Sequence, residues 1–173
     1  CAALGIFRGV CELDLPVELH VVVGAAENMP DGASFRPDDI LRAYNGKTIE
    51  VDNTDAEGRL TLADALAYAA EQKPDRMVDL ATLTGACVVA LGENTAGLFA
   101  NQDGLAEELV RASRATGERL WRLPMDDETL KKQLKSSVAD LVNCGSRWGG
   151  AITAALFLES FGPEGLPRAH LDI

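Results

Sequence analysis

The sequence lacks the long apolar runs and paired cysteines that mark membrane proteins and disulfide-rich secreted proteins. No window approaches the roughly 18 uninterrupted apolar residues of a bilayer-spanning helix, and no basic-then-apolar signal segment opens the chain. The four cysteines (Cys1, Cys11, Cys87 and Cys144) show no CxxC spacing, and there is no Asn-x-Ser/Thr sequon. We therefore expect free, mostly buried thiols in a reducing cytosol, and a cytoplasmic protein with no membrane partner.

Positive charge is also scarce. The chain has 16 Lys and Arg residues against 27 Asp and Glu residues, which gives a formal net charge of −11. An acidic balance of this size argues against nucleic acid or an anionic membrane as a partner. The rest of the composition, 47% apolar and 25% charged, is that of a globular protein, and 173 residues suffice for one domain with a real core.

No internal repeat or low-complexity segment interrupts an alternation of strand-like and helix-like stretches. Strands are predicted at 18–25, 39–44, 48–52, 76–83, 95–101 and 168–173. Helices are predicted at 60–72, 85–91 (a helix or loop of small residues), 103–116, 126–136 and 150–161. Asn45-Gly46 is a strong hairpin turn signal, and Asp103 is predicted to cap the helix at 103–116. The pattern predicts an α/β fold of three layers, with a largely parallel mixed sheet flanked by helices.

The run Asn53–Leu60 carries the most informative chemistry. Asp55 and Glu57 stand two positions apart, and Arg59 follows two positions later. Acids at a strand-to-helix junction can hold a divalent cation, and ligands of open α/β sheets bind beyond the carboxyl ends of strands. The small Ala56 and Gly58 allow close approach of a ligand, and an arginine is a planar donor suited to an oxyanion. The alternative is that the acids only cap a helix or lie in a solvated loop.

The eight residues together, NTDAEGRL at 53–60, resemble the signature of the leucyl (cytosol) aminopeptidase family, which are dinuclear metal exopeptidases. Other segments resemble the same family: AENMP at 26–30, FRPDD at 35–39, GKTIEV at 46–51, DLATLTGA at 79–86, LWRLP at 120–124, WGGAITAA at 148–155 and AHLDI at 169–173. They stand in the family's order and span nearly the whole chain.

The resemblance implies a set of residue roles. Asp55 and Glu57 would be metal ligands, and Arg59 would be catalytic and would hold a bicarbonate ion that serves as general base. Two divalent metal ions per subunit, Mn²⁺ or Zn²⁺, would activate the attacking water. The substrates implied are peptides with leucine-like apolar N-terminal residues.

Substrate-binding residues are implied in the same way. The backbone of the loop that contains Leu83 would hold the peptide, and Thr82 and Gly85 would border the first side-chain pocket. Asn53 and Ala56 would form the wall of the next pocket. A tight helix entry capped by Thr84 is an alternative role for the first loop, and it is compatible with substrate binding.

The family's other metal ligands, a lysine and two aspartates, and a second catalytic lysine come from an upstream segment. The resemblance therefore implies that residues 1–173 are a partial catalytic domain, without that segment and without the extreme C-terminus. We expect the isolated chain to be inactive and the intact protein to form a hexamer. Two other readings stay open: a non-catalytic assembly or binding subunit of the same fold, and a simple Ca²⁺ or Mg²⁺ loop. The loop would need further acids at alternating positions after Glu57.

Three further features carry no site of their own. Gly46-Lys47-Thr48 has Leu41 where a phosphate-binding loop requires glycine. His20 and His170 lie in predicted strands and have no partner at metal-ligand spacing, so both are expected to be core or structural histidines.

Overall fold

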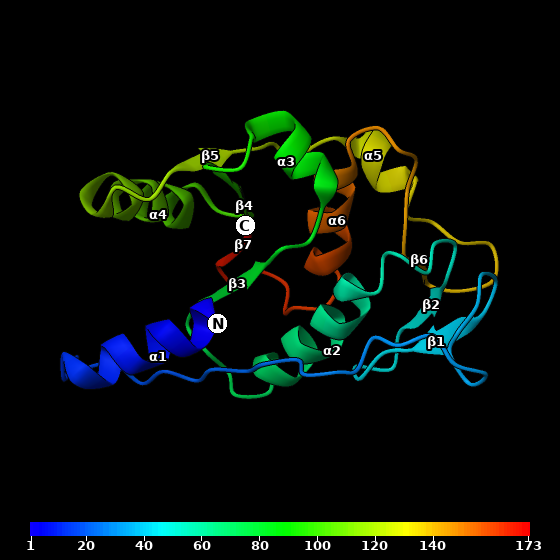
Figure 1. Cartoon of the computed structure of the whole chain (residues 1–173), viewed down its shortest axis with the longest axis horizontal. Coiled ribbons are helices and arrows are strands. Elements are labelled where there is room, and N and C mark those ends of the chain that lie inside the picture. Colours follow the sequence, from blue (N-terminus) through cyan, green and yellow to red (C-terminus); the bar gives the residue numbers. More distant parts are fainter.

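Two separate sheets organise the chain in the computed structural model, which describes residues 1–173 (Figure 1). The larger sheet contains β3 (Met77–Ala81), β4 (Ala96–Ala100), β5 (Leu120–Arg122) and β7 (Arg168–Asp172), in the order β3-β7-β4-β5. Two of its three strand pairs are parallel, and only β4 and β7 run antiparallel. The smaller sheet contains β1 (Ile40–Arg42), β2 (Thr48–Glu50) and β6 (Leu141–Val142), in the order β1-β2-β6.

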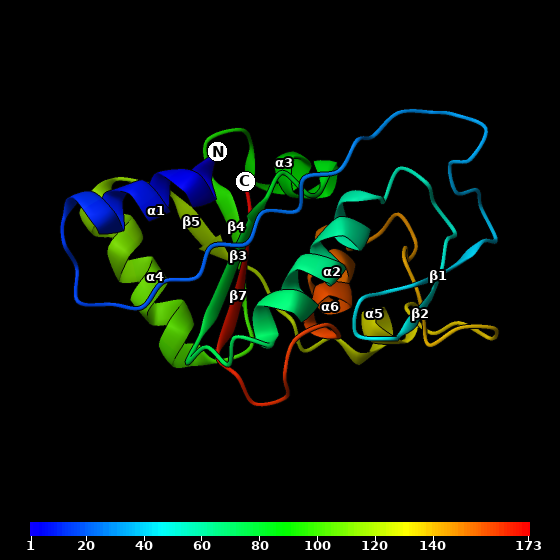
Figure 2. The same ribbon diagram turned by 90° about the horizontal axis from the view of Figure 1, so that it is seen from below.

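Six helices accompany the strands: α1 (Ala2–Glu12), α2 (Gly58–Ala70), α3 (Gly85–Leu91), α4 (Asp103–Thr116), α5 (Glu128–Lys132) and α6 (Gly150–Glu159). Figure 2 shows α4 on one side of the larger sheet, and α6 and α2 on the other. No helix here combines the length and the apolar character that crossing a bilayer requires.

Side chains along β4 point alternately to the two faces of the larger sheet and pack against the helices on each face. Leu98 packs in one cluster with Leu105 of α4, whereas its neighbour Phe99 packs in another with Cys87 of α3 and Ala155 of α6. Successive strand residues point to opposite faces, so one strand supplies both cores. The predicted α/β class, with helices on both faces of a mixed, largely parallel sheet, is confirmed, and a separate three-stranded sheet is added to it.

The helix α6 joins the two sheets. Because it is apolar on all sides, it is buried on all sides, and its buried residues are Ala151, Thr153, Ala154, Ala155, Leu156, Phe157 and Leu158. Phe157 lies in a cluster with Ile49 of β2 and Leu66 of α2. The same helix therefore fixes α2, which follows the Asn53–Leu60 run, relative to the larger sheet.

Local signals predicted several elements well. The turn at Asn45-Gly46 joins an antiparallel pair, with Gly46 at a positive φ of 88°. The helices predicted at 85–91 and 103–116 have those same bounds in the structure.

Other expectations were wrong. Residues 18–25 form no strand and are mostly exposed, because the segment pairs with none of the strands. His20 is accordingly exposed beside Glu18 rather than buried.

The helix predicted at 126–136 is only the short α5, and Gln102, not Asp103, is the N-cap of α4. The strands β5 and β6 were not predicted. All four cysteines are free, but Cys1 and Cys11 are exposed.

His170, in contrast, has the predicted structural role. It lies on β7 opposite Asp79 of β3, with Nδ1 2.6 Å from a carboxylate oxygen of Asp79. The ring stacks on Phe99. A cavity of about 20 Å³ borders these three residues, and it has room for a single water molecule. The imidazole therefore ties neighbouring strands together inside the core.

The C-terminal end of α6 depends on a close approach at Gly162. Arg168 is buried, and its Nη1 and Nη2 each donate a 2.8 Å hydrogen bond, to the carbonyl oxygens of Glu159 and Leu158 respectively. These bonds satisfy carbonyls that the helix leaves free at its end. Burial lowers the pKa of the Arg168 guanidinium, and the neighbouring Asp79 and Glu159 carboxylates oppose this effect. A Cβ atom at Gly162 would overlap the guanidinium.

We expect Gly162→Ala to lower the free energy of unfolding by about 1–3 kcal/mol, because the added methyl group must displace Arg168 from both carbonyls. Equilibrium urea unfolding followed by circular dichroism measures the change. Gly104→Ala is the control: Gly104 lies on α4 with nothing near its Cβ position, so alanine should be neutral or slightly stabilising there. Equal stability of the two variants would contradict this account of Gly162.

Candidate active site

The loop between β2 and α2 is held by one buried residue that follows β6, the strand paired with β2. Asn143 follows β6 and is 0% exposed. Its Oδ1 accepts hydrogen bonds from the backbone N–H of Asp52 (2.9 Å) and of Asn53 (3.2 Å). Its Nδ2 donates to the carbonyl oxygens of Asn53 (2.7 Å) and Ala56 (3.4 Å). The loop conformation is therefore set from a position remote in sequence.

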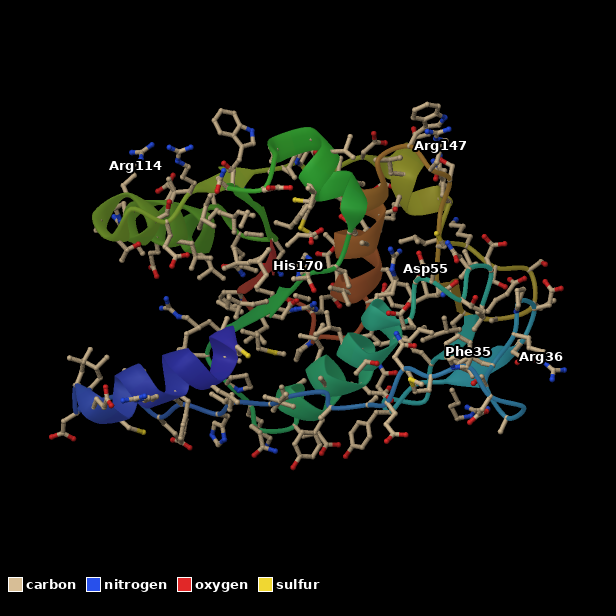
Figure 3. The ribbon with its side chains drawn as sticks, in the orientation of Figure 1. Phe35, Arg36, Asp55, Arg114, Arg147 and His170 are labelled. Atoms are coloured by element: carbon tan, nitrogen blue, oxygen red, sulfur yellow. The ribbon has the colours of Figure 1, made fainter.

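Two carboxylates project from this held loop. Asp55 is exposed (Figure 3) and Glu57 is half-buried. Glu57 occupies the N-cap position of α2, but its side chain makes no capping hydrogen bond. No hydrogen bond or ion pair within the chain uses either carboxylate group. Capping by the Glu57 side chain is therefore wrong, whereas the exposed Asp55 also agrees with a solvated loop.

Arg59 stands in the first turn of α2 with its side chain turned inward, and the residue is 6% exposed. Its Nη1 donates a 2.9 Å hydrogen bond to the carbonyl oxygen of Asn143, whereas its buried Nε has no partner. Burial lowers the pKa of the guanidinium, and the neighbouring Cys144, Asp172 and Glu57 oppose this effect. Buried donors are almost always paired. Nε is an exception that is closed to solvent, whereas Nη2 also makes no hydrogen bond and is not among the buried atoms, so an anion could reach the guanidinium only through Nη2.

A second loop follows β3 and is held from the end of β7. Asp172 is buried, and its Oδ1 accepts hydrogen bonds from the backbone N–H of Leu83 (2.9 Å) and Thr84 (3.1 Å). Its Oδ2 accepts a 2.6 Å bond from the Thr84 hydroxyl. The Thr84 Oγ1 in turn accepts from the N–H of Cys87 and so caps α3. Thr82 and Gly85, on either side of these anchored residues, are exposed.

The two loops adjoin. A Cδ atom of Leu83 lies 3.5 Å from the place that a Cβ atom would occupy on Gly58, between Glu57 and Arg59. The charge of Asp172, which anchors the second loop, also acts on Arg59. The structure thus brings the run around Asp55, Glu57 and Arg59 together with the Thr82–Gly85 loop. His170 lies apart from Asp55, at the larger sheet (Figure 3).

The remaining residues of the predicted site differ in exposure. Asn53 is exposed, and its Oδ1 accepts a 2.9 Å hydrogen bond from the N–H of Asp55. Ala56 is buried, and its carbonyl faces Asn143. Sequence reasoning missed the two anchors, Asn143 and Asp172, because no local pattern marks a residue whose partners are far away in the chain.

The acidic side chains of this chain could supply only some of the ligands that a metal ion needs. The structure contains no group of three or more His, Cys, Asp and Glu side chains that could hold a metal ion. Asp55 and Glu57 offer carboxylate oxygens, which suit hard or borderline divalent cations. They would form one side of such a site, and further ligands would have to complete it.

Comparison with known proteins identifies the family of this chain. The profile of the cytosol aminopeptidase family, catalytic domain, matches residues 1–173. A probable cytosol aminopeptidase from Aquifex aeolicus is 62% identical over 173 residues, which cover 100% of this chain and 35% of the relative. Leucine aminopeptidase 1 from Arabidopsis thaliana is 54% identical, with 99% of this chain and 33% of the relative covered. The chain thus spans about a third of the length of these curated relatives.

Solved structures show the same relationship. A mutant of tomato leucine aminopeptidase superimposes with a TM-score of 0.95 at 53% identity, covering 99% of this chain and 34% of that one. The bottromycin maturation enzyme BotP in complex with Mn gives a TM-score of 0.81 at 48% identity, covering 86% of this chain and 33% of that one. From the full-length match to the family profile, with the fold and loops described above, we conclude that this chain belongs to the cytosol aminopeptidase family.

Proposed function

We propose that this chain is part of the catalytic domain of a metal-dependent aminopeptidase, which releases leucine-like apolar residues from the N-termini of peptides. One observation supports this most directly: two carboxylates free of internal hydrogen bonds, on Asp55 and Glu57, precede a buried Arg59 whose Nη1 is held by the Asn143 carbonyl. Because the relatives are about three times as long, the activity is that of the complete protein.

Asp55 and Glu57 would hold part of a pair of divalent ions, Mn²⁺ or Zn²⁺. The other ligands, a lysine and two aspartates by resemblance, would come from a segment outside these 173 residues. When bound, such ions polarise the scissile carbonyl and lower the pKa of water. BotP, a structural neighbour, is described in complex with Mn, which favours manganese among the candidates.

Arg59 would supply a fixed positive charge beside the reacting groups. Its Nη1 donates to the carbonyl of Asn143, which orients the guanidinium, and its Nη2 is left to bind an anion. A preoriented donor of this kind stabilises negative charge that develops on an oxygen atom, and it does so best where water is excluded. Bicarbonate is the anion that we propose for this position, as a proton acceptor.

The Thr82–Gly85 loop would receive the substrate. Leu83 and Thr84 are anchored by Asp172, which leaves the exposed Thr82 and Gly85 to border the pocket for the first side chain. Asn53 and Ala56 would line the pocket for the next residue. Ala56 is buried, so we expect it to contribute chiefly its small size there.

We also propose that the complete protein is cytoplasmic and assembles as a homo-hexamer. Relatives carry the name cytosol aminopeptidase, although one from Arabidopsis thaliana is named as chloroplastic. The helix α1 has no buried residue, and its Leu4, Phe7 and Ile6 are large apolar side chains exposed by 46–59%. An exposed apolar surface of this kind is typical of contact with more protein.

Metal removal tests the proposed function. We expect the complete protein to hydrolyse leucine p-nitroanilide, to lose this activity after dialysis against a chelator, and to regain it on addition of Mn²⁺. N-acetyl-leucine p-nitroanilide is the control substrate, because an aminopeptidase requires the free α-amine. The isolated 173-residue chain should show no turnover under the same conditions, since it offers no complete ligand set. Activity that survives chelation, or turnover by the isolated chain with Mn²⁺, would contradict the proposal.

A further inference from the structure

Asn143 uses every hydrogen-bonding position of its side chain on the loop that carries the two carboxylates. A primary amide offers two donors and an oxygen with two acceptor positions. Here both acceptor positions face N–H groups, of Asp52 and Asn53, and both donors face carbonyls, of Asn53 and Ala56. The four contacts agree on one orientation of the amide, because a flipped amide would set N–H against N–H and oxygen against oxygen.

The backbone of the same residue determines where Arg59 lies. The carbonyl oxygen of Asn143 accepts the 2.9 Å hydrogen bond from Nη1 of Arg59, and its N–H donates a 2.9 Å bond to the carbonyl of Glu50. That second bond continues the parallel pairing of β2 with β6, in which Glu50 is opposite Val142. The sheet therefore fixes the position of Asn143. Through its hydrogen bonds, Asn143 in turn fixes the positions of the loop and of the Arg59 guanidinium.

No other side chain of similar size could replace this amide. Aspartate keeps the two acceptor positions but has no donor, so a carboxylate oxygen would face the carbonyls of Asn53 and Ala56. Because Asn143 is fully buried, water could not relieve that repulsion. Serine is neutral but too short to span the loop.

We propose that Asn143 is a positioning residue, which sets the metal-binding loop and the guanidinium of Arg59 in a single arrangement. This inference rests on the proposed function for its kinetic consequences, whereas its structural consequences do not depend on that function. Asn143 does not touch the substrate. Its effect passes through Asp55, Glu57 and Arg59.

The test uses Asn143→Asp and Asn143→Ser in the complete protein. Residues that orient metal-binding groups typically contribute about 10- to 100-fold to activity or metal affinity. We therefore expect kcat on leucine p-nitroanilide to fall by about 10- to 100-fold, with KM changed by less than about threefold. Mn²⁺ affinity, measured by calorimetry, should weaken by a similar factor. In the metal-free Asn143→Ser variant, hydrogen exchange at the amides of Asp52 and Asn53 should accelerate by about tenfold or more.

The matched control is Asn101→Asp. Asn101 also bridges two segments, since its Nδ2 donates to the carbonyl of Leu166 and its Oδ1 accepts from the N–H of Arg168, but it lies outside the site. We expect this variant to keep kcat and Mn²⁺ affinity.

Equal losses in the Asn101 and Asn143 variants would overturn the inference, as would unchanged exchange at Asp52 and Asn53. A parent protein with no peptidase activity would refute the proposed function alone, because the exchange measurement still decides the role of Asn143. If the Asn143→Asp variant does not fold, the Asn143→Ser variant alone supplies both the kinetic and the hydrogen-exchange measurements.

Discussion

Arg59→Lys is expected to lower kcat of the complete protein by about 100- to 1000-fold, the range found when one preoriented donor to a developing oxyanion is removed. Lysine carries a charge but no planar fork, so one ammonium group cannot keep the Asn143 carbonyl and also present a second donor to an anion as the guanidinium does through Nη2. Burial also lowers the pKa of the native guanidinium. A lysine at this buried position would lose its proton more readily still. Steady-state kinetics with leucine p-nitroanilide at saturating Mn²⁺ measure the loss.

Arg168→Lys is the matched control for this substitution. Arg168 is also a buried arginine whose pKa is lowered by burial, but its donors bind the end of α6. We expect Arg168→Lys to lower the thermal midpoint while kcat stays within about threefold of the parent value. If the two variants lose kcat equally, or if Arg59→Lys keeps the parent value, the catalytic role of Arg59 is wrong.

Asp172→Ala should reduce kcat/KM by about 100-fold, because it frees the loop that borders the substrate pocket. The buried carboxylate accepts three hydrogen bonds, from the N–H groups of Leu83 and Thr84 and from the Thr84 hydroxyl. Without it, both N–H groups lose their acceptor in a partly buried place, which costs about 1–3 kcal/mol for each group. The loss should fall mainly on KM, since the loop binds the substrate and Arg59 stays in place.

Asp172→Asn separates geometry from charge. Asparagine keeps an oxygen that can accept from both N–H groups, and the Thr84 hydroxyl can accept from its amide. We therefore expect most of the activity to return. If Asp172→Asn is as damaging as Asp172→Ala, the negative charge near Arg59 is what matters, and the hydrogen bonds to Leu83 and Thr84 are not the cause.

Elements with strong local signals could be predicted from the sequence. The Asn45-Gly46 turn fixes its hairpin because glycine tolerates the positive φ that the turn requires. The helix at 103–116 has an apolar face that packs on the sheet, and Gly117 ends it in the left-handed conformation. In each case the physical cause lies within a few residues of the element.

Elements that depend on distant partners could not be predicted in this way. The segment 18–25 is rich in β-branched residues, but a strand needs a neighbour to bond its backbone, and none pairs with it here. β6 has only two residues, and it exists because β2 pairs with it in parallel. The same stretch of sequence can thus be a strand or a loop, according to whether another strand pairs with it.

The sequence by itself determined which chemical groups this protein has: two acids and an arginine in one short run, with small residues between them. Only the tertiary structure decided how those groups are held. Asn143 binds the loop at Asn53 across 90 positions, and Asp172 binds Leu83 across 89 positions. Such partners meet because strand pairing brings remote segments together, and the side chains that then face one another follow from the register of the sheets, which a local pattern does not contain.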